Sequence, residues 1–111
     1  VKAVKRDTRG GDINEQIHWV ELQAVSSTGV NRKGWLYGDA THFAFETIDY
    51  WVLVDKKSLQ SFISEKCKDK IKVSNPGDAL YKLYTRKGRN DIITKVKTLD
   101  LFYISEQIIK K

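Results

Sequence analysis

Glu21 and Gln23 are the residues of this 111-residue chain whose types and spacing best suit a metal-binding catalytic site. They lie two apart at the end of residues 17–23, an apolar-rich run that alternates like a strand, so both side chains are expected on one face. A strand over residues 1–5 is expected to pair with this run as a hairpin, which would bring Asp7 or Asp12 close to Glu21. Carboxylates arranged in this way suit Mg²⁺, a hard cation that prefers oxygen ligands.

A metal ion held by these acids would support cleavage of a phosphodiester bond. It would activate a water molecule and neutralise the charge that grows on the phosphate. A lysine or an amide beside that water would orient it or stabilise the charge, and Gln23, Lys5 and Lys2 are the candidates. The alternative interpretation stays open: Glu21 and Gln23 are also typical of the solvent-facing side of an amphipathic strand, and Asp12 of a turn.

The charge of the chain agrees with a polyanionic partner. The formal net charge is +6 and the sequence pI is about 9.4, which favours association with nucleic acid, although many basic proteins bind none. Two basic loops could hold phosphates, one with Arg32 and Lys33 and one with Arg86, Lys87 and Arg89. Ordinary lysine- and glycine-rich turns are the alternative interpretation of both loops.

Length and cysteine content limit the architecture. A chain of this length suits a single domain over residues 1–111 with one core. One cysteine, Cys67, allows no intramolecular disulfide, which predicts a reducing compartment such as the cytoplasm. No apolar run reaches the roughly 18 residues of a membrane helix. No methionine is present, even at position 1, so we expect either removal of the initiator or excision from a longer chain.

The hydrophobic pattern predicts an α/β (α+β) domain, with one central, mixed and largely antiparallel sheet flanked by two helices. Asp55 is a good N-cap for the first helix, which carries an apolar stripe at Leu59, Phe62, Ile63 and Cys67. The second helix is predicted from Thr98 to Ile109. The predicted strands cover residues 1–5, 15–23, 43–46, 50–54, 80–86 and 92–96.

Several of these segments resemble the PD-(D/E)XK nuclease superfamily, in particular its small phage or virus-like members. The resemblance covers about half of the chain, and its most distinctive part is the turn Gly34-Trp35-Leu36-Tyr37-Gly38, followed by Ala44-Phe45-Glu46. It implies a restriction-endonuclease-like core, Mg²⁺ or Mn²⁺ as cofactor, and DNA as substrate, whether duplex, branched or single-stranded. It also leaves a homodimer open, and places the protein in the host cytoplasm if a phage encodes it.

The chain departs from the family pattern at its first strand. Similar proteins carry an acid-x-Lys triplet there, whereas Val1-Lys2-Ala3 lacks the acid, and Ala3-Val4-Lys5 has alanine in its place. Glu21 with Gln23 at the lysine position is the alternative placement. Three functions therefore stay open: a magnesium-dependent DNA endonuclease, a non-catalytic nucleic-acid-binding module or part of a larger nuclease, and a phage protein that binds a host protein through Trp35 and Tyr37.

Overall fold

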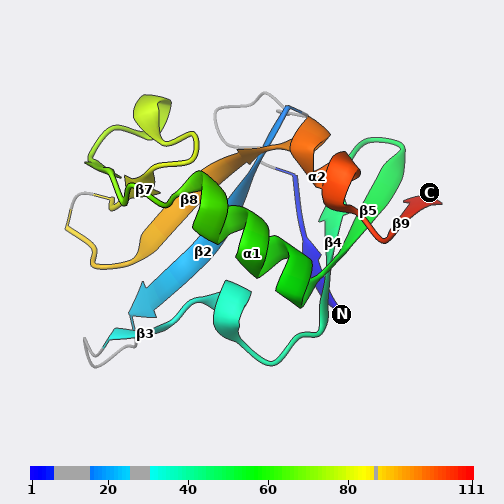
Figure 1. The fold of residues 1–111 in the computed structure, drawn as a ribbon, viewed down its shortest axis with the longest axis horizontal. Coiled ribbons are helices and arrows are strands. Elements are labelled where there is room, and N and C mark those ends of the chain that lie inside the picture. The colour runs from blue at the N-terminus through cyan, green and yellow to red at the C-terminus, as the bar shows by residue number, and fades with distance from the viewer. Residues whose placement is uncertain (7–15, 26–30, 87) are drawn as a thin grey trace.

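Two β-sheets and two α-helices make up the computed structural model of the chain, which describes residues 1–6, 16–25, 31–86 and 88–111 (Figure 1). Each sheet contains both parallel and antiparallel strand pairs. The mixed α/β class and the two helices confirm the prediction from the sequence. Within the described residues, no helix combines the length and the apolar character that crossing a membrane would require.

The four-stranded sheet brings together strands from the beginning, the middle and the end of the sequence. In spatial order its strands are β1 (Lys2–Val4), β4 (His42–Glu46), β5 (Tyr50–Asp55) and β9 (Gln107–Lys110). β1 runs parallel to β4, and the other two pairs are antiparallel. Phe43 and Phe45 of β4 and Val52 and Val54 of β5 are fully buried, so one face of this sheet is turned toward the core.

The five-stranded sheet carries four of the candidate site residues, Glu21, Gln23, Arg32 and Lys33. In spatial order its strands are β3 (Asn31–Lys33), β2 (Ile17–Val25), β8 (Ile92–Lys97), β7 (Leu83–Tyr84) and β6 (Lys72–Val73). A short 3-10 helix, η3 (Pro76–Asp78), lies between β6 and β7. His18 and Val20 of β2 are buried, whereas Trp19 and Glu21 are half-buried. The alternation predicted for this strand is therefore confirmed up to Glu21.

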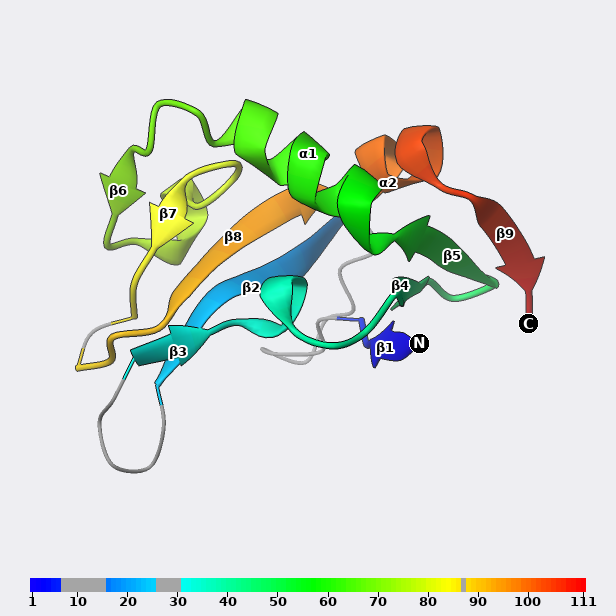
Figure 2. The same ribbon diagram turned by 60° about the horizontal axis from the view of Figure 1, so that its bottom comes forward.

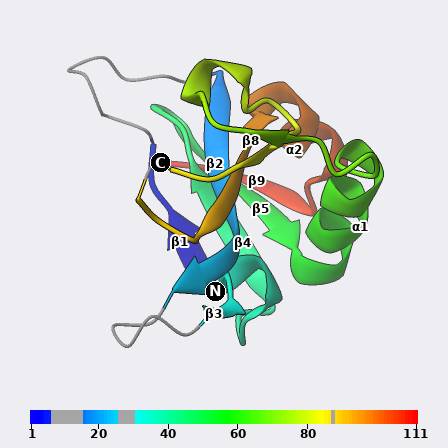
Figure 3. The ribbon, with the colours of Figure 1, turned by 90° about the vertical axis from the view of Figure 1, so that its left-hand side faces the viewer.

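Helix α1 (Lys56–Lys66) follows β5 directly and lies on one side of the strands (Figure 3). The Asp55 carboxylate accepts the backbone N–H of Ser58 at 3.0 Å, which is the predicted N-cap. Leu59, Ile63 and Cys67 are buried, so the predicted apolar stripe is confirmed. Two shorter helices complete the chain, α2 (Thr98–Ile104) after β8 and the 3-10 helix η2 (Trp35–Tyr37) between β3 and β4.

Both sheets contribute to one main core. Its buried members come from β2, β4, β5, β8 and the three helices α1, α2 and η2. His18 links the sheets within this core, because its Nδ1 lies 2.8 Å from Thr98 Oγ1 and its Nε2 lies 2.7 Å from the carbonyl oxygen of Glu46. A carbonyl only accepts, so Nε2 carries the proton and donates to Glu46; in the neutral ring Nδ1 then accepts from the threonine hydroxyl.

The side chain of Glu46 holds segments from both ends of the sequence. Its Oε1 accepts the backbone N–H of Arg6 at 3.2 Å, and its Oε2 lies 2.8 Å from Lys111 Nζ. The lysine contact is the main cause that lowers the pKa of this carboxyl below its ordinary value.

The prediction of a single central sheet was wrong, because the strands divide between two sheets. The predicted hairpin of residues 1–5 with residues 15–23 does not form: β1 pairs with β4, and β2 pairs with β3 and β8. Alternating apolar residues define which face of a strand is buried, but they do not define its neighbour. The restriction-endonuclease-like core stays a prediction.

The second helix is shorter than predicted. It ends at Ile104, and residues 107–110 form strand β9 beside β5. The backbone of Ser105 is extended and ends the helix. The two isoleucines that follow, Ile108 and Ile109, are β-branched and fit a strand well, and β5 offers them an unpaired edge. Tertiary pairing therefore prevails over the helical spacing of these residues.

Candidate functional site

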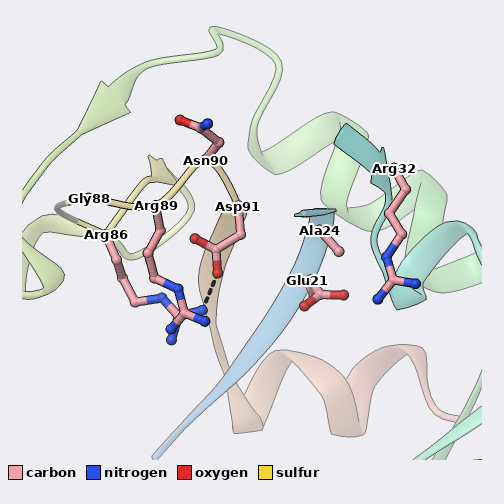
Figure 4. Close-up of a pocket in the computed structure, with 8 residues that line it drawn as sticks. All are labelled: Glu21, Ala24, Arg32, Arg86, Gly88, Arg89, Asn90 and Asp91. Carbon is pink, nitrogen blue, oxygen red and sulfur yellow. Dashed lines mark hydrogen bonds and ion pairs between the residues drawn. The ribbon is translucent and has the colours of Figure 1, made fainter. Parts of the chain in front are cut away.

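A pocket of about 380 Å³ lies where β2, β3 and the segment between β7 and β8 meet (Figure 4). We call it the arginine pocket, and its lining residues are Glu21, Ala24, Arg32, Arg86, Gly88, Arg89, Asn90 and Asp91. Figure 4 shows Arg86 and Arg89 on one side, Arg32 on the other, and the Glu21 carboxylate between them in this view. Three arginines and two carboxylates thus come from segments far apart in the sequence.

An irregularity in β2 determines which side chains reach the arginine pocket. The β2–β8 register shifts between Glu21, which is opposite Ile93, and Gln23, which is opposite Ile92. A bulge of this kind changes the alternation of side chains along a strand. As a result Glu21 and Ala24 line the same pocket, and the prediction that Glu21 and Gln23 share a face was wrong.

Gln23 lines a second hollow, also of about 380 Å³, together with Leu22, Asn31, Arg32 and Lys33. Its side-chain Nε2 donates to the carbonyl oxygen of Asn90 at 2.8 Å. This bond ties β2 to the segment before β8. The nucleic-acid-binding candidates Arg32 and Lys33 are neighbours on β3, and Arg32 lines both hollows.

Arg86 and Asp91 form an ion pair at the wall of the arginine pocket (Figure 4). Asp91 is buried, with 6% of its surface exposed, so a cation beside it is required to offset the cost of burying its charge. The pair leaves Arg86 Nε and Asp91 Oδ1 buried, and among the described residues neither atom has a hydrogen-bond partner. The segment before β8 is therefore held by charge as well as by the bond from Gln23.

Glu21 is half-buried and its Oε1 accepts the backbone N–H of Trp35 at 3.2 Å. Trp35 packs against Phe43 and Phe45, with ring centres 5.0 and 6.4 Å apart. The predicted aromatic turn thus closes one end of the core, and of its two aromatic residues Tyr37 is the exposed one. The contact with Trp35 fixes one carboxylate oxygen of Glu21.

The other predicted catalytic residues that the structure describes, Lys2 and Lys5, lie away from this pocket. Lys2 Nζ lies 5.7 Å from the ring centre of Trp35, and Lys5 Nζ lies 5.3 Å from that of Trp51 on β5. Neither lysine is among the residues that line the arginine pocket. Asp7, Asp12 and Lys87 fall outside the described residues. Across the described ranges, no three or more His, Cys, Asp or Glu side chains form a group that could hold a metal ion.

Asp91 is the charged pocket residue that the sequence interpretation missed. It follows the basic loop of residues 86–90 directly and lies five positions after Arg86. An acid immediately after a basic hairpin loop is a signal for an internal ion pair, and it could have marked this position. Comparison of the chain with protein-family models, with curated proteins and with solved structures finds no match.

Proposed function

We propose that this protein binds nucleic acid through its phosphate backbone, with the arginine pocket as the main contact. The observation that carries the proposal is the convergence of Arg32, Arg86 and Arg89 on one pocket. The guanidinium group presents several donors in a planar fork that matches phosphate oxygens, so arginine is well suited to this contact. The net charge of +6 would attract a polyanion over a longer range.

The charges of the pocket fit one phosphodiester. Its three arginines and two carboxylates leave one formal positive charge, and a phosphodiester carries one negative charge. Asp91 already neutralises Arg86 in part, whereas Arg32 and Arg89 are exposed. We therefore assign the phosphate contact mainly to Arg32 and Arg89, with Arg86 shaping the wall.

Fluorescence anisotropy with labelled DNA, at salt concentrations from about 50 to 200 mM, tests this function. Arg32→Ala and Arg89→Ala should each weaken binding and reduce the salt slope by roughly 0.7 to 0.9. Lys110→Ala is the matched control, since Lys110 is an exposed cation on β9, in the other sheet. Equal losses in all three variants, or an affinity that does not change with salt, would contradict the proposal.

A second candidate is cleavage of the bound phosphodiester with Mg²⁺ or Mn²⁺, and the position of Glu21 in the arginine pocket favours it. Mg²⁺ in proteins is commonly held by one or two carboxylates together with substrate phosphates. Glu21 would be the first ligand, and Asp7 or Asp12 the second, as the sequence predicts; Asp91 is a further acid at this pocket. Bound Mg²⁺ would supply Lewis acidity at the phosphate.

Nicking of supercoiled DNA in the presence of Mg²⁺ or Mn²⁺ tests the second candidate. Glu21→Gln keeps the size of the side chain and removes its charge, so it should abolish nicking while DNA binding is retained. An intact plasmid after incubation with the wild-type protein would contradict the endonuclease proposal and leave the proposed binding function unaffected. The buried free thiol of Cys67 agrees with a reducing compartment such as the cytoplasm for either function.

A further inference from the structure

Strand β3 is the outer strand of the five-stranded sheet, and its two faces carry two separate hollows. It pairs with β2 on one side, and among the described residues no strand pairs with its other side (Figure 2). Arg32 is opposite Ala24, and both line the arginine pocket. Lys33 is opposite Gln23, and both line the second hollow.

The two hollows lie on opposite faces of the sheet. Neighbouring residues of a strand point to opposite faces, which separates Arg32 from Lys33. Leu22 lines the second hollow and packs against the main core, so this hollow is on the core side. Glu21 lines the arginine pocket on the other side. Of the described residues, Arg32 is the one that lines both hollows, so it links them at the edge of the sheet.

We propose that single-stranded nucleic acid is the ligand, and that it bends around the β3 edge. One phosphate would occupy the arginine pocket and a neighbouring phosphate the second hollow, where Lys33 supplies the cation and Asn31 and Gln23 supply amide groups. This inference rests on the proposed function, because it names the class of nucleic acid that the arginine pocket takes.

The geometry disfavours a duplex in this position. A single strand rotates freely about its backbone bonds and follows a groove of cations. A DNA duplex has a persistence length of about 150 base pairs, so it does not fold around a strand of three residues. A duplex would reach the exposed Arg32 and Arg89 from one side only, and would leave Lys33 without a phosphate.

The test compares an oligothymidylate of about 16 nucleotides, near the upper end of single-strand site sizes, with a duplex of the same length. The wild-type protein should bind the single strand more tightly. Lys33→Ala should weaken single-strand binding by about fivefold to tenfold and reduce its salt slope by about 0.7, with no change for the duplex. Lys110→Ala, which removes the same charge from β9 in the other sheet, should leave both affinities unchanged.

The outcomes separate this inference from the proposed function. Equal affinity for the two ligands overturns the inference and leaves phosphate binding at the arginine pocket in place, provided that Arg89→Ala still weakens both. A preference for the single strand that does not depend on Lys33 also overturns it. Failure to bind either ligand overturns the proposed function and the inference together. Circular dichroism of each variant confirms that an altered affinity is not a loss of fold.

Discussion

A single methyl group added at Gly34 should disrupt the backbone of β2 beside the arginine pocket. A Cβ added there would clash with the carbonyl oxygen of Glu21, and would lie 2.6 Å from the carbonyl carbons of Glu21 and Leu22. These atoms are backbone atoms of the irregular part of β2, so they cannot rotate away. The φ of −71° at Gly34 is open to any residue, so the expected effect of Gly34→Ala is steric.

The size of the effect follows from the displacement. Ordinary carbon contacts lie at about 3.5–4.0 Å, so the two segments must separate by roughly 1 Å. This shift would also strain the 3.0 Å bond from Gly34 N to the Leu22 carbonyl oxygen. Overpacking of this kind typically costs about 1–3 kcal/mol, and a backbone neighbour places the substitution at the upper end. For a domain of this size, that corresponds to a melting temperature lower by roughly 8–12 °C.

Gly38→Ala is the matched control, since Gly38 lies on the other side of η2. The nearest atom to an added Cβ is Trp35 O at 3.4 Å, an ordinary contact, and the φ of −83° suits alanine. Loss of unfolded-state entropy should make this variant about 0.4–1 kcal/mol more stable. Urea unfolding followed by tryptophan fluorescence compares the two variants. A midpoint for Gly34→Ala equal to or above that of Gly38→Ala would refute the steric argument.

Three further predictions concern buried and titrating groups. His18→Leu should cost about 2–4 kcal/mol, since it removes the hydrogen-bond partner of the buried Thr98 hydroxyl and of the part-buried Glu46 carbonyl; a thermal unfolding curve close to wild type would contradict this. In the folded state, hydrogen bonds from Ser58 lower the pKa of Asp55 below 3.8. The stability that these bonds provide is therefore complete above pH 3.8 and is lost as the pH falls through the folded-state pKa. Asp55→Asn should therefore flatten the acid side of the stability–pH curve measured by urea unfolding. Burial raises the pKa of Tyr81, so Tyr81→Phe should leave the phenolate absorbance change below about pH 12 unaltered. If the variant instead lost the signal of one tyrosine from that titration, the raised pKa of Tyr81 would be contradicted.

The features that could be predicted from the sequence are those encoded by neighbouring residues. Helix α1 has its signals within one short segment: Asp55 as N-cap and Leu59 and Ile63 at helical spacing. The buried face of β2 is encoded in the same local way by His18 and Val20. Such a periodic pattern indicates which side of a helix or strand faces the core. That side is the same whichever element packs against it.

The composition of the arginine pocket depends on contacts that no local pattern encodes. Arg32, Arg86 and Glu21 were each candidates, but their convergence requires the pairing of β2 with both β3 and β8. The register shift after Glu21 then decides that Gln23 faces the second hollow. A shift of one residue exchanges the faces of all residues beyond it, so prediction from strict alternation fails at that point.

The position of Glu46 has a consequence for how the folded chain opens. Its two carboxylate oxygens each hold one segment, the backbone of Arg6 on one side and the ammonium group of Lys111 on the other. Detachment of either segment would leave this carboxylate of β4 with fewer donors and weaken its contact with the other segment. The first and last strands of the four-stranded sheet should then fray as a pair, with amide protons in β1 and β9 exchanging at correlated rates under native conditions.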